Sequence, residues 1–476
     1  MNPTEIAERL LLEATSAAAR RPLPESTYRL QFHAGFTFRD ALAIVPYLNA
    51  LGITHCYASP YLKARPGSTH GYDIIDHGSL NPEIGTTEDL DAWVSALHEH
   101  GMGQIVDTVP NHMGVGTSDN VWWNDVLENG PASRYAPYFD IAWRSSLRPE
   151  LRDKVLLPVL ADLYGDVLEA GELALAFVDG AFFVQYGDRR FPIAPRSYDR
   201  ILAYGLEELE RSLGADDPSL IEFQSVLTAV RNLPGSSETE PEKVMERQRE
   251  KEVIKRRLAV LAAESQPIRD FILGNVARFA GSPGDPPSFD LMDDLLENQC
   301  YRLSYWRVAS DEINYRRFFD INDLAALAME REEVFEAAHA LVLRLVGEGK
   351  VDGLRIDHPD GLYDPATYFR RLQDHAILAC ARRTFDADTT FQSAEWTDLE
   401  PKLRDLIAAR DGKADEGRSG PLLHVVVEKI LGSREALVDS WLVHGTSGYD
   451  FLNQVSGLFV DGNHLDAVSR IYRDFV

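Results

Sequence analysis

VDGLRIDHPDG, residues 351–361, is the stretch that decides how this 476-residue chain folds. An apolar-rich run leads to Arg355, Ile356 and Asp357, and the chain then turns at Gly361. Side chains on a β-strand point alternately to opposite faces, so Arg355 and Asp357 are expected to lie on the same side. The pattern therefore predicts a buried strand whose end carries a cation and a carboxylate in one place.

Similar β-like runs occur along the chain, with helical patterns between them. Thr86 is a candidate N-cap for one helix, and Gly52 and Gly101 are typical of helix ends. Alternating strands and helices predict a parallel sheet or a (β/α) barrel. Strands are expected at residues 27–32, 53–58, 104–109, 351–357, 424–428 and 444–451. Because a TIM-type (β/α)₈ barrel has eight strands, we expect a barrel that is incomplete at its C-terminal side, with two exposed sheet edges.

The regular alternation of strands and helices stops in the middle of the chain. Charged helical patterns predominate there, and Pro234–Ser237 and Gly281–Pro287 are typical of loops. Long loops of a barrel often carry such insertions. We therefore expect three segments. They are the first part of a barrel (residues 1–115), a large, mainly helical insertion after the third strand (116–320) and the continuation of the barrel (321–476).

Composition and charge exclude several classes of protein. The net charge of −27 argues against nucleic acid as a partner, since phosphates require Lys and Arg. We see no apolar run long enough for a membrane span, and the N-terminal residues have the pattern of an amphipathic helix instead of a secretory signal. Cys56, Cys300 and Cys380 are scattered, which fits a cytoplasmic protein and indicates neither a disulfide framework nor a metal cluster.

Two acids at the ends of two strands, Asp357 and Glu428, suit glycosidic chemistry. Retaining glycosidases use a carboxylate nucleophile and a proton-donating carboxylic acid about 5–5.5 Å apart, and neighbouring strands lie about 4.8 Å apart. Arg355 would favour an ionised Asp357, and the three valines before Glu428 would favour a protonated acid. In the structural alternative, Asp357 caps the next segment and pairs with Arg355 in an ordinary ion pair. Glu428 is then a solvated side chain beside Lys429.

Further candidates for sugar contacts lie at and before the end of the third strand. Asp107 would orient the loop that contains Asn111, and His112 could donate a hydrogen bond to a sugar hydroxyl. Tyr72 offers a flat apolar face and a hydroxyl group. The alternative for His112 and Tyr72 is a structural role in the core. Weaker candidates for sugar stacking form an aromatic-rich stretch: Trp122, Trp123, Tyr135, Tyr138, Phe139 and Trp143.

The order of these motifs resembles that of a known superfamily. G-Y-D (residues 71–73), D-x-x-x-N-H (107–112), G-L-R-I-D-H (353–358) and V-V-V-E-K (425–429) resemble the motifs of the alpha-amylase superfamily of (β/α)₈ enzymes. PGSTHGYD (66–73), WWNDVLENG (122–130), DGLYDP (360–365) and GTSGYDFLN (445–453) are similar to the maltooligosyl trehalose synthases. The resemblance extends from about residue 25 to residue 476.

The resemblance implies that Asp357 is the nucleophile and Glu428 the acid/base of an intramolecular transglucosylation. Such an enzyme converts the reducing-end α-1,4 linkage of a linear α-1,4-glucan to α,α-1,1, giving a maltooligosyl trehalose. It uses neither a metal nor an organic cofactor. The residues expected to bind the substrate are Tyr72, His112, Arg355, His358, Asp107 and Asn111. The expected partners are a maltooligosaccharide and a functionally coupled hydrolase that releases trehalose.

Two features of that family are missing from these 476 residues. The family has a third catalytic carboxylate, an Asp near the seventh strand, and a final β-rich domain. We therefore expect little turnover from this chain alone. Two alternatives stay open: an α-1,4-glucan hydrolase of the alpha-amylase superfamily, and an inactive or partner-dependent fragment of such an enzyme.

Overall fold

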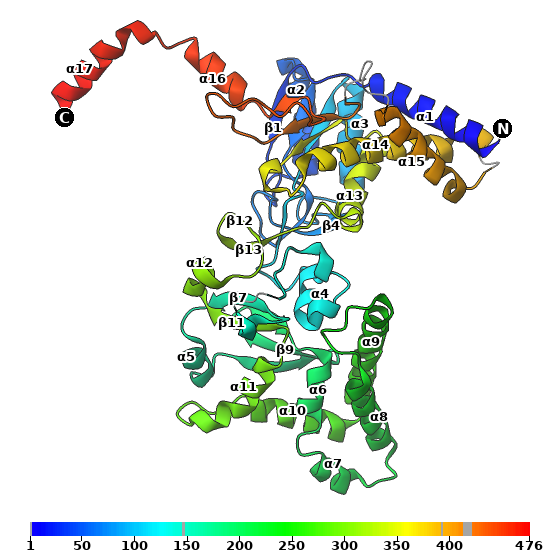
Figure 1. Cartoon of the computed structure of the whole chain (residues 1–476), viewed down its shortest axis with the longest axis vertical. Coiled ribbons are helices and arrows are strands. Elements are labelled where there is room, and N and C mark those ends of the chain that lie inside the picture. Colours follow the sequence, from blue (N-terminus) through cyan, green and yellow to red (C-terminus); the bar gives the residue numbers. More distant parts are fainter. Residues whose placement is uncertain (1, 145–147, 392–393, 413–420) are drawn as a thin grey trace. The chain divides into compact units, whose positions relative to one another are not determined.

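The computed structural model describes the whole chain except residues 1, 145–147, 392–393 and 413–420. The chain divides into two compact units (Figure 1). The first unit comprises Met1–Gly71, His77–Asn111 and Phe335–Val476. The second unit comprises Tyr72–Asp76 and His112–Val334. Along the sequence, the second unit is therefore an insertion into the first.

A parallel six-stranded sheet is the centre of the first unit. Its strands follow the order β1-β2-β5-β14-β15-β16, and each neighbouring pair is parallel. The strands are β1 (Thr27–Leu30), β2 (His55–Ala58), β5 (Gly103–Thr108), β14 (Gly353–Ile356), β15 (His424–Val427) and β16 (Gly445–Thr446). This sheet confirms the predicted incomplete (β/α)₈ barrel.

The last predicted strand is much shorter than expected. Residues 445–446 form β16, but Gly448 adopts a left-handed conformation at φ 101°, and helix α16 (Tyr449–Gly457) begins directly after it. The prediction of a strand over 444–451 is therefore wrong in its second half. Glycine allows the positive φ that starts the helix at this point.

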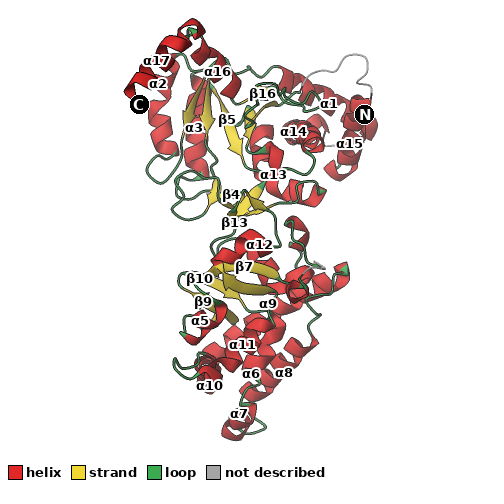
Figure 2. Cartoon of the chain, turned by 60° about the vertical axis from the view of Figure 1, so that its left-hand side comes forward, coloured by secondary structure: helices red, strands yellow, loops and turns green. Residues whose placement is uncertain are grey.

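Helices accompany the strands of the first unit (Figure 2). Their starts follow from the sequence: Thr37 and Thr86 each form a capping box, with Asp40 and Asp89 respectively, at the start of α2 and α3. Gly52 ends α2 in the left-handed conformation, as predicted. The helices are α2 (Phe38–Leu51), α3 (Thr87–Glu99), α13 (Glu332–Gly347) and α14 (Pro365–Ala387).

The N-terminal helix α1 (Pro3–Ala19) packs on α14 and α15 (Trp396–Gly412). Its buried face consists of small and aliphatic side chains, which confirms the predicted amphipathic helix. The cluster formed by the three helices includes Ile6, Leu10, Ala14, Ala381, Phe385, Leu399 and Leu403, and Phe391 joins it from the segment between α14 and α15. This apolar contact ties the start of the chain to the helices between β14 and β15.

The second unit contains three groups of strands among its helices, which the helical pattern of the sequence did not indicate. One is a parallel pair, one is an antiparallel hairpin sheet, and one joins the ends of the unit's main segment. They are β7 (Val155–Leu160) with β11 (Tyr301–Tyr305), β8 (Ala174–Val178) with β9 (Ala181–Tyr186) and β10 (Arg189–Pro192), and β6 (His112–Gly114) with β13 (Ile321–Ala326) and β12 (Arg317–Phe318). The longer helices are α8 (Pro218–Asn232), α9 (Pro241–Glu264) and α10 (Gln266–Phe279).

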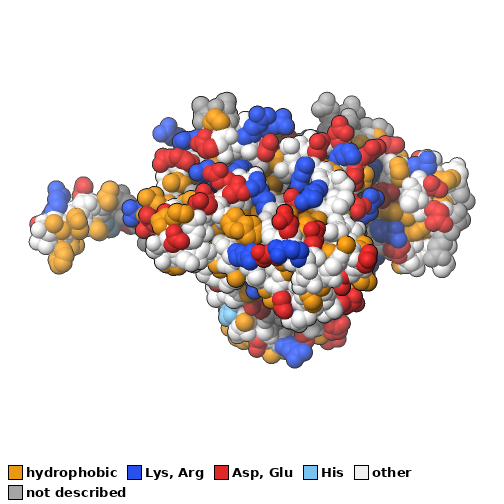
Figure 3. Space-filling model, turned by 90° about the horizontal axis from the view of Figure 1, so that it is seen from below, with side chains coloured by type: hydrophobic (Ala, Val, Ile, Leu, Met, Phe, Trp, Pro, Cys, Tyr) orange, Lys and Arg blue, Asp and Glu red, His pale blue; other side chains and the backbone are white. Residues whose placement is uncertain are grey.

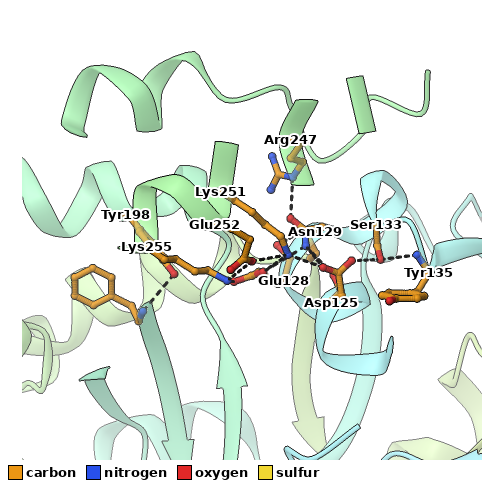
Figure 4. A network of polar contacts seen from close by, with 12 residues as sticks. Asp125, Glu128, Asn129, Ser133, Tyr135, Tyr198, Arg247, Lys251, Glu252 and Lys255 are labelled. Carbon is orange, nitrogen blue, oxygen red and sulfur yellow. Dashed lines mark hydrogen bonds and ion pairs between the residues drawn. The ribbon is translucent and has the colours of Figure 1, made fainter. Parts of the chain in front are cut away.

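A buried charged network joins α9 to α4 (Val121–Asn129) inside the second unit (Figure 4). The Lys251 ammonium contacts Asp125 at 2.5 Å and Glu128 at 2.7 Å, and Lys255 contacts Glu128 at 2.6 Å. The Asn129 amide oxygen accepts a hydrogen bond from Arg247 at 2.9 Å. Opposite charges in contact offset the cost of burying each of them.

The surface is mixed in character. Acidic and basic side chains are interspersed over the face shown in Figure 3. The terminal helix α17 (Leu465–Phe475) leaves Leu465, Val468, Ile471 and Phe475 largely exposed. None of the helices in the described ranges is long and apolar enough to cross a membrane.

Candidate active site

Charged side chains gather at the carboxyl ends of three neighbouring strands of the first unit. Asp107 lies near the end of β5, Arg355 lies in β14, and Asp357 and Glu428 directly follow β14 and β15. The ladder pairs Arg355 with Asp107. The Asp357 N–H donates to the Thr108 carbonyl at 2.9 Å, and the Glu428 N–H donates to the Ile356 carbonyl at 2.9 Å. Parallel strands therefore deliver all four side chains to one edge of the sheet.

The Arg355 guanidinium lies between two carboxylates. Its Nη1 donates to Asp357 Oδ1 at 2.7 Å and to Asp107 Oδ1 at 2.8 Å. All three side chains are buried, with Asp107 and Arg355 most enclosed. The ion pair between Arg355 and Asp357 that the sequence indicated is present, and it extends to a second acid on the neighbouring strand.

The environment of Asp357 raises its pKa to about 6. Burial is the main cause, because it disfavours the charged form; the negative charges of Asp107 and Glu428 add to the rise, and Arg355 opposes it. With a pKa of about 6, Asp357 is mostly ionised at neutral pH and protonated in mild acid. Its carboxylate is thus available as a nucleophile at neutral pH.

Glu428 is half-buried at the end of β15. The ammonium of its sequence neighbour Lys429 lies 3.0 Å from Asp360 and 2.8 Å from Glu435. Lys429 is thus engaged with two other carboxylates. Because Glu428 follows Val427 in the register that pairs Val427 with Ile356, it is the strand neighbour of Asp357.

The turn after β14 carries His358 and packs against Asn111. His358 has a φ of 45°, a left-handed conformation that is uncommon for residues other than glycine, and it precedes the short helix Pro359–Gly361. A Cβ at Gly361 would lie 2.4 Å from the Asn111 Oδ1 and 2.4 Å from a His358 ring carbon. A side chain at this position would therefore displace His358 or Asn111, which lie beside each other at Gly361.

Tyr72 and His112 belong to the second unit. Tyr72 is half-buried. His112 begins β6, is buried, and its ring lies 4.3 Å from that of Phe318. The first unit thus brings together six of the candidates, and the second unit holds these two. The six are Asp107, Asn111, Arg355, Asp357, His358 and Glu428.

The aromatic-rich stretch of the second unit separates into a core part and a partly exposed part. Trp123 is buried, and its ring packs against Phe139 and Tyr315. Trp122 is half-buried, stacks on Tyr135 at 5.8 Å between ring centroids and meets Tyr138 edge-on at 4.8 Å. Trp123 is therefore a core residue in this structure.

Sequence reasoning missed two contributors to the site, Tyr57 in β2 and Arg29 in β1. The Tyr57 hydroxyl donates to Asp107 Oδ2 at 2.8 Å, and an Arg29 nitrogen lies 3.7 Å from the same oxygen. Both occupy the face of the sheet on which Asp107 lies. The alternation of side chains along each strand is the signal that could have identified them.

Potential metal ligands elsewhere in the first unit already have a cation beside them. Glu336 in α13 and His375 in α14 both contact the Arg404 guanidinium, at 3.2 Å and 3.3 Å. A metal ion there would meet electrostatic repulsion from that guanidinium.

Comparisons with known proteins bear on this site. Residues 42–165 match the model of the alpha amylase catalytic domain. A putative maltooligosyl trehalose synthase of Mycobacterium tuberculosis is 31% identical over 443 residues, which are 92% of this chain and 38% of that protein. The solved maltooligosyltrehalose synthase of Arthrobacter ramosus is 30% identical with a TM-score of 0.59, covering 94% of this chain and 40% of that one. A hypothetical maltooligosyl trehalose synthase of Sulfolobus tokodaii is 28% identical with a TM-score of 0.57, covering 96% of this chain and 42% of that one.

These likenesses cover nearly the whole of this chain, but this chain spans about two fifths of the length of those relatives. Shorter likenesses include amylases and a trehalose synthase. The intracellular maltogenic amylase of Bacillus subtilis is 40% identical over 95 residues, which are 20% of this chain.

Proposed function

Because this chain is related along 92% of its length to maltooligosyl trehalose synthases and matches the alpha-amylase catalytic domain, we propose that it carries out an intramolecular transglucosylation. The reaction converts the reducing-end α-1,4 linkage of a maltooligosaccharide to α,α-1,1 and yields a maltooligosyl trehalose. The observation that carries the proposal is the placement of Asp357 and Glu428 at neighbouring strand ends, with Asp357 hydrogen-bonded to the same Arg355 nitrogen that binds Asp107.

In the first step, Asp357 attacks the anomeric carbon of the penultimate glucose, and a covalent glucosyl–enzyme bond forms. Glu428 gives its proton to the glycosidic oxygen, so that the reducing-end glucose leaves as a neutral alcohol. The pKa of about 6 keeps Asp357 mostly ionised at neutral pH, as this step requires.

In the second step, the departed glucose stays bound and turns. Its anomeric hydroxyl attacks the glucosyl–enzyme carbon, Glu428 takes the hydroxyl proton, and Asp357 leaves as a carboxylate. Two displacements at one carbon retain its α configuration. No water is consumed, so the reaction is an isomerisation provided that water is excluded while the intermediate exists.

The remaining candidates bind and orient the sugar in this proposal. Arg355 and His358 lie at the carboxyl edge of the sheet, and Asp107 and Asn111 hold that edge in place. Tyr72 and His112, the other expected sugar-binding residues, belong to the second unit. The groups for proton transfer and nucleophilic attack are side chains of the chain itself, so the proposed reaction calls for no cofactor. Residues 1–115 and 321–476 are then the two parts of the catalytic barrel, with 116–320 as its inserted subdomain.

The proposed function also includes a partner enzyme and a location in the cell. The product carries a trehalose unit joined to an α-1,4-glucan, so a hydrolase that releases trehalose is the expected next enzyme. A cytoplasmic location is supported by three separate, buried free thiols: Cys56, Cys300 and Cys380.

The test is to incubate the protein that carries this chain, at its full natural length, with maltopentaose. The proposal predicts that reducing ends disappear while little glucose is released. An increase in reducing ends together with free glucose or maltose would instead indicate the alternative, an α-1,4-glucan hydrolase. Binding of maltopentaose without turnover would indicate an inactive or partner-dependent chain.

A further inference from the structure

Asp107 is a carboxylate to which two strands bring hydrogen-bond donors and a third strand brings a nearby guanidinium. Its side chain is fully buried. Tyr57 in β2 donates its hydroxyl to Oδ2 at 2.8 Å, and Arg355 in β14 donates to Oδ1 at 2.8 Å. Arg29 in β1 places Nη1 3.7 Å from Oδ2. A carboxylate is held in one orientation when both of its oxygens have donors in this way.

Tyr57 and Arg29 also hold each other. They are partners in the ladder between β1 and β2, and the Arg29 guanidinium lies 4.9 Å from the centre of the Tyr57 ring. A cation over an aromatic face at this distance is attracted by the ring. The pair therefore forms a fixed support on one side of Asp107.

Asp357 lies on the other side of the same chain of contacts. The Arg355 nitrogen that binds Asp107 also binds Asp357, at 2.7 Å. One guanidinium thus serves two carboxylates, and its position depends on where Asp107 is held. Arg29 supplies a second positive charge next to Asp107.

We propose that Arg29 and Tyr57 are positioning residues for the nucleophile Asp357, acting through Asp107 and Arg355. This inference rests on the proposed function, because it takes Asp357 as the nucleophile. Neither residue is expected to touch the sugar. Tyr57 fixes the orientation of Asp107, and Arg29 offsets its negative charge.

The charges around Asp107 and Asp357 determine in which direction the pKa of Asp357 changes when Arg29 is replaced. In the described part of the first unit, Asp107 faces Arg29 from β1, Tyr57 from β2 and Arg355 from β14. Its negative charge and that of Glu428 raise the pKa of Asp357, whereas Arg355 lowers it. Without the positive charge of Arg29, the negative charge of Asp107 acts more strongly on Asp357, so the pKa of Asp357 rises further. A higher pKa protonates the nucleophile at a pH where it is ionised in the natural protein.

The expected result is a displaced pH profile. In Arg29→Gln, the acid limb of kcat/KM moves upward by up to about one pH unit, so the loss of activity is up to about tenfold greater below pH 6 than at pH 8. Tyr57→Phe keeps the ring under Arg29 and removes the hydroxyl alone, so it produces a smaller shift in the same direction. Arg29→Lys keeps the positive charge, so its dependence of kcat/KM on pH should be close to that of the natural protein. A purely structural defect would lower activity at all pH values.

The readout is covalent labelling of Asp357 by a fluorinated α-glucosyl fluoride, followed by mass spectrometry as a function of pH. This probe reports the nucleophile whether the enzyme isomerises or hydrolyses its substrate. Arg39→Gln is the matched control, because Arg39 in α2 is an exposed arginine that pairs with Asp89. Its profile should coincide with that of the natural protein.

The outcomes separate the two proposals. Labelling of Asp357 with an acid limb that moves in Arg29→Gln supports the inference, even if maltopentaose is hydrolysed and the proposed isomerisation fails. Labelling with an unmoved acid limb in Arg29→Gln and Tyr57→Phe overturns the inference and leaves the proposed function intact. Absence of label at Asp357 in the natural protein overturns both.

Discussion

In a Lys251→Met variant, we expect the second unit to lose about 3 kcal/mol of its free energy of unfolding. The Lys251 ammonium lies 2.5 Å from Asp125 Oδ1 and 2.7 Å from Glu128 Oε2, and its side chain is 3% exposed. Methionine preserves the length of the side chain and removes the charge. Loss of one partner from a buried ion pair costs about 3–5 kcal/mol, because the other charge stays buried without compensation.

The remaining contacts place the expected loss at the lower end of this range. Glu128 retains the Lys255 ammonium at 2.6 Å. Asp125 retains the Ser133 hydroxyl at 2.5 Å and the Asn129 amide at 3.1 Å, which are neutral donors (Figure 4). Asp125 is thus the acid that loses its cation, and these two neutral hydrogen bonds are what remains to it.

Hydrogen–deuterium exchange in increasing urea measures this loss locally, on peptides from α4 and α9. Lys243→Met is the matched control on α9, because Lys243 is exposed and pairs with the exposed Glu246; we expect no measurable change from it. A Lys251→Met/Asp125→Asn double variant should recover part of the loss, since it removes the buried charge as well. The reasoning is refuted if Lys251→Met behaves like Lys243→Met, or if the double variant is less stable than the single one.

Three further predictions concern other parts of the chain. Asp357→Asn should lower kcat/KM with maltopentaose by at least about three orders of magnitude at pH 8, measured by loss of reducing ends; residual activity within tenfold of the natural protein would exclude Asp357 as nucleophile. Gly180→Ala should lower the free energy of unfolding of the second unit by more than about 1 kcal/mol in urea, because Gly180 has φ +79° and an added Cβ would lie 1.9 Å from the Lys255 carbonyl oxygen. Gly187→Ala is the control, because the space around Gly187 is open, and it should lower the free energy of unfolding by less. Equal losses in the two variants would contradict this prediction. Burial lowers the pKa of His339 to about 4, so the folded state favours the neutral imidazole. The contribution of His339 to the free energy of unfolding is therefore fully present above about pH 6.5, and about 3 kcal/mol of stability is lost as the pH falls toward 4. In His339→Asn, the free energy of unfolding should fall less steeply over this pH range, and an unchanged slope would contradict the assignment.

The strand ends of the first unit were predictable because they depend on neighbouring residues in the sequence and not on contacts with distant ones. A buried parallel strand needs an apolar run, and a polar residue at its carboxyl end is visible in the sequence, as with Asp357 after Ile356 and Glu428 after Val427. The neighbours of these residues were harder to predict. Tyr57 and Arg29 contact Asp107 from strands 50 and more residues earlier, and no local pattern states which strands pair.

The second unit shows two signals that the helical interpretation overlooked. Asp179-Gly180 separates two apolar runs and forms the turn between β8 and β9, where both residues have positive φ, as an Asp-Gly hairpin turn requires. Helix α9 has many charged residues, a composition typical of exposed helices, yet Arg247, Lys251, Ile254 and Leu258 follow one another at helical spacing and are all buried. A stripe of this kind predicts burial even when it contains cations, provided that acids such as Asp125 and Glu128 meet them.

The central claim is that the departing glucose stays bound to the enzyme until it is transferred back. One isotope experiment tests this claim directly. Maltopentaose is incubated with the protein that carries this chain at its full natural length, in the presence of excess ¹³C-labelled glucose, and the products are analysed by mass spectrometry and NMR. The account predicts a non-reducing pentasaccharide with an α,α-1,1 linkage and no label in it. Labelled product, or one free unlabelled glucose for each maltopentaose consumed, would contradict it.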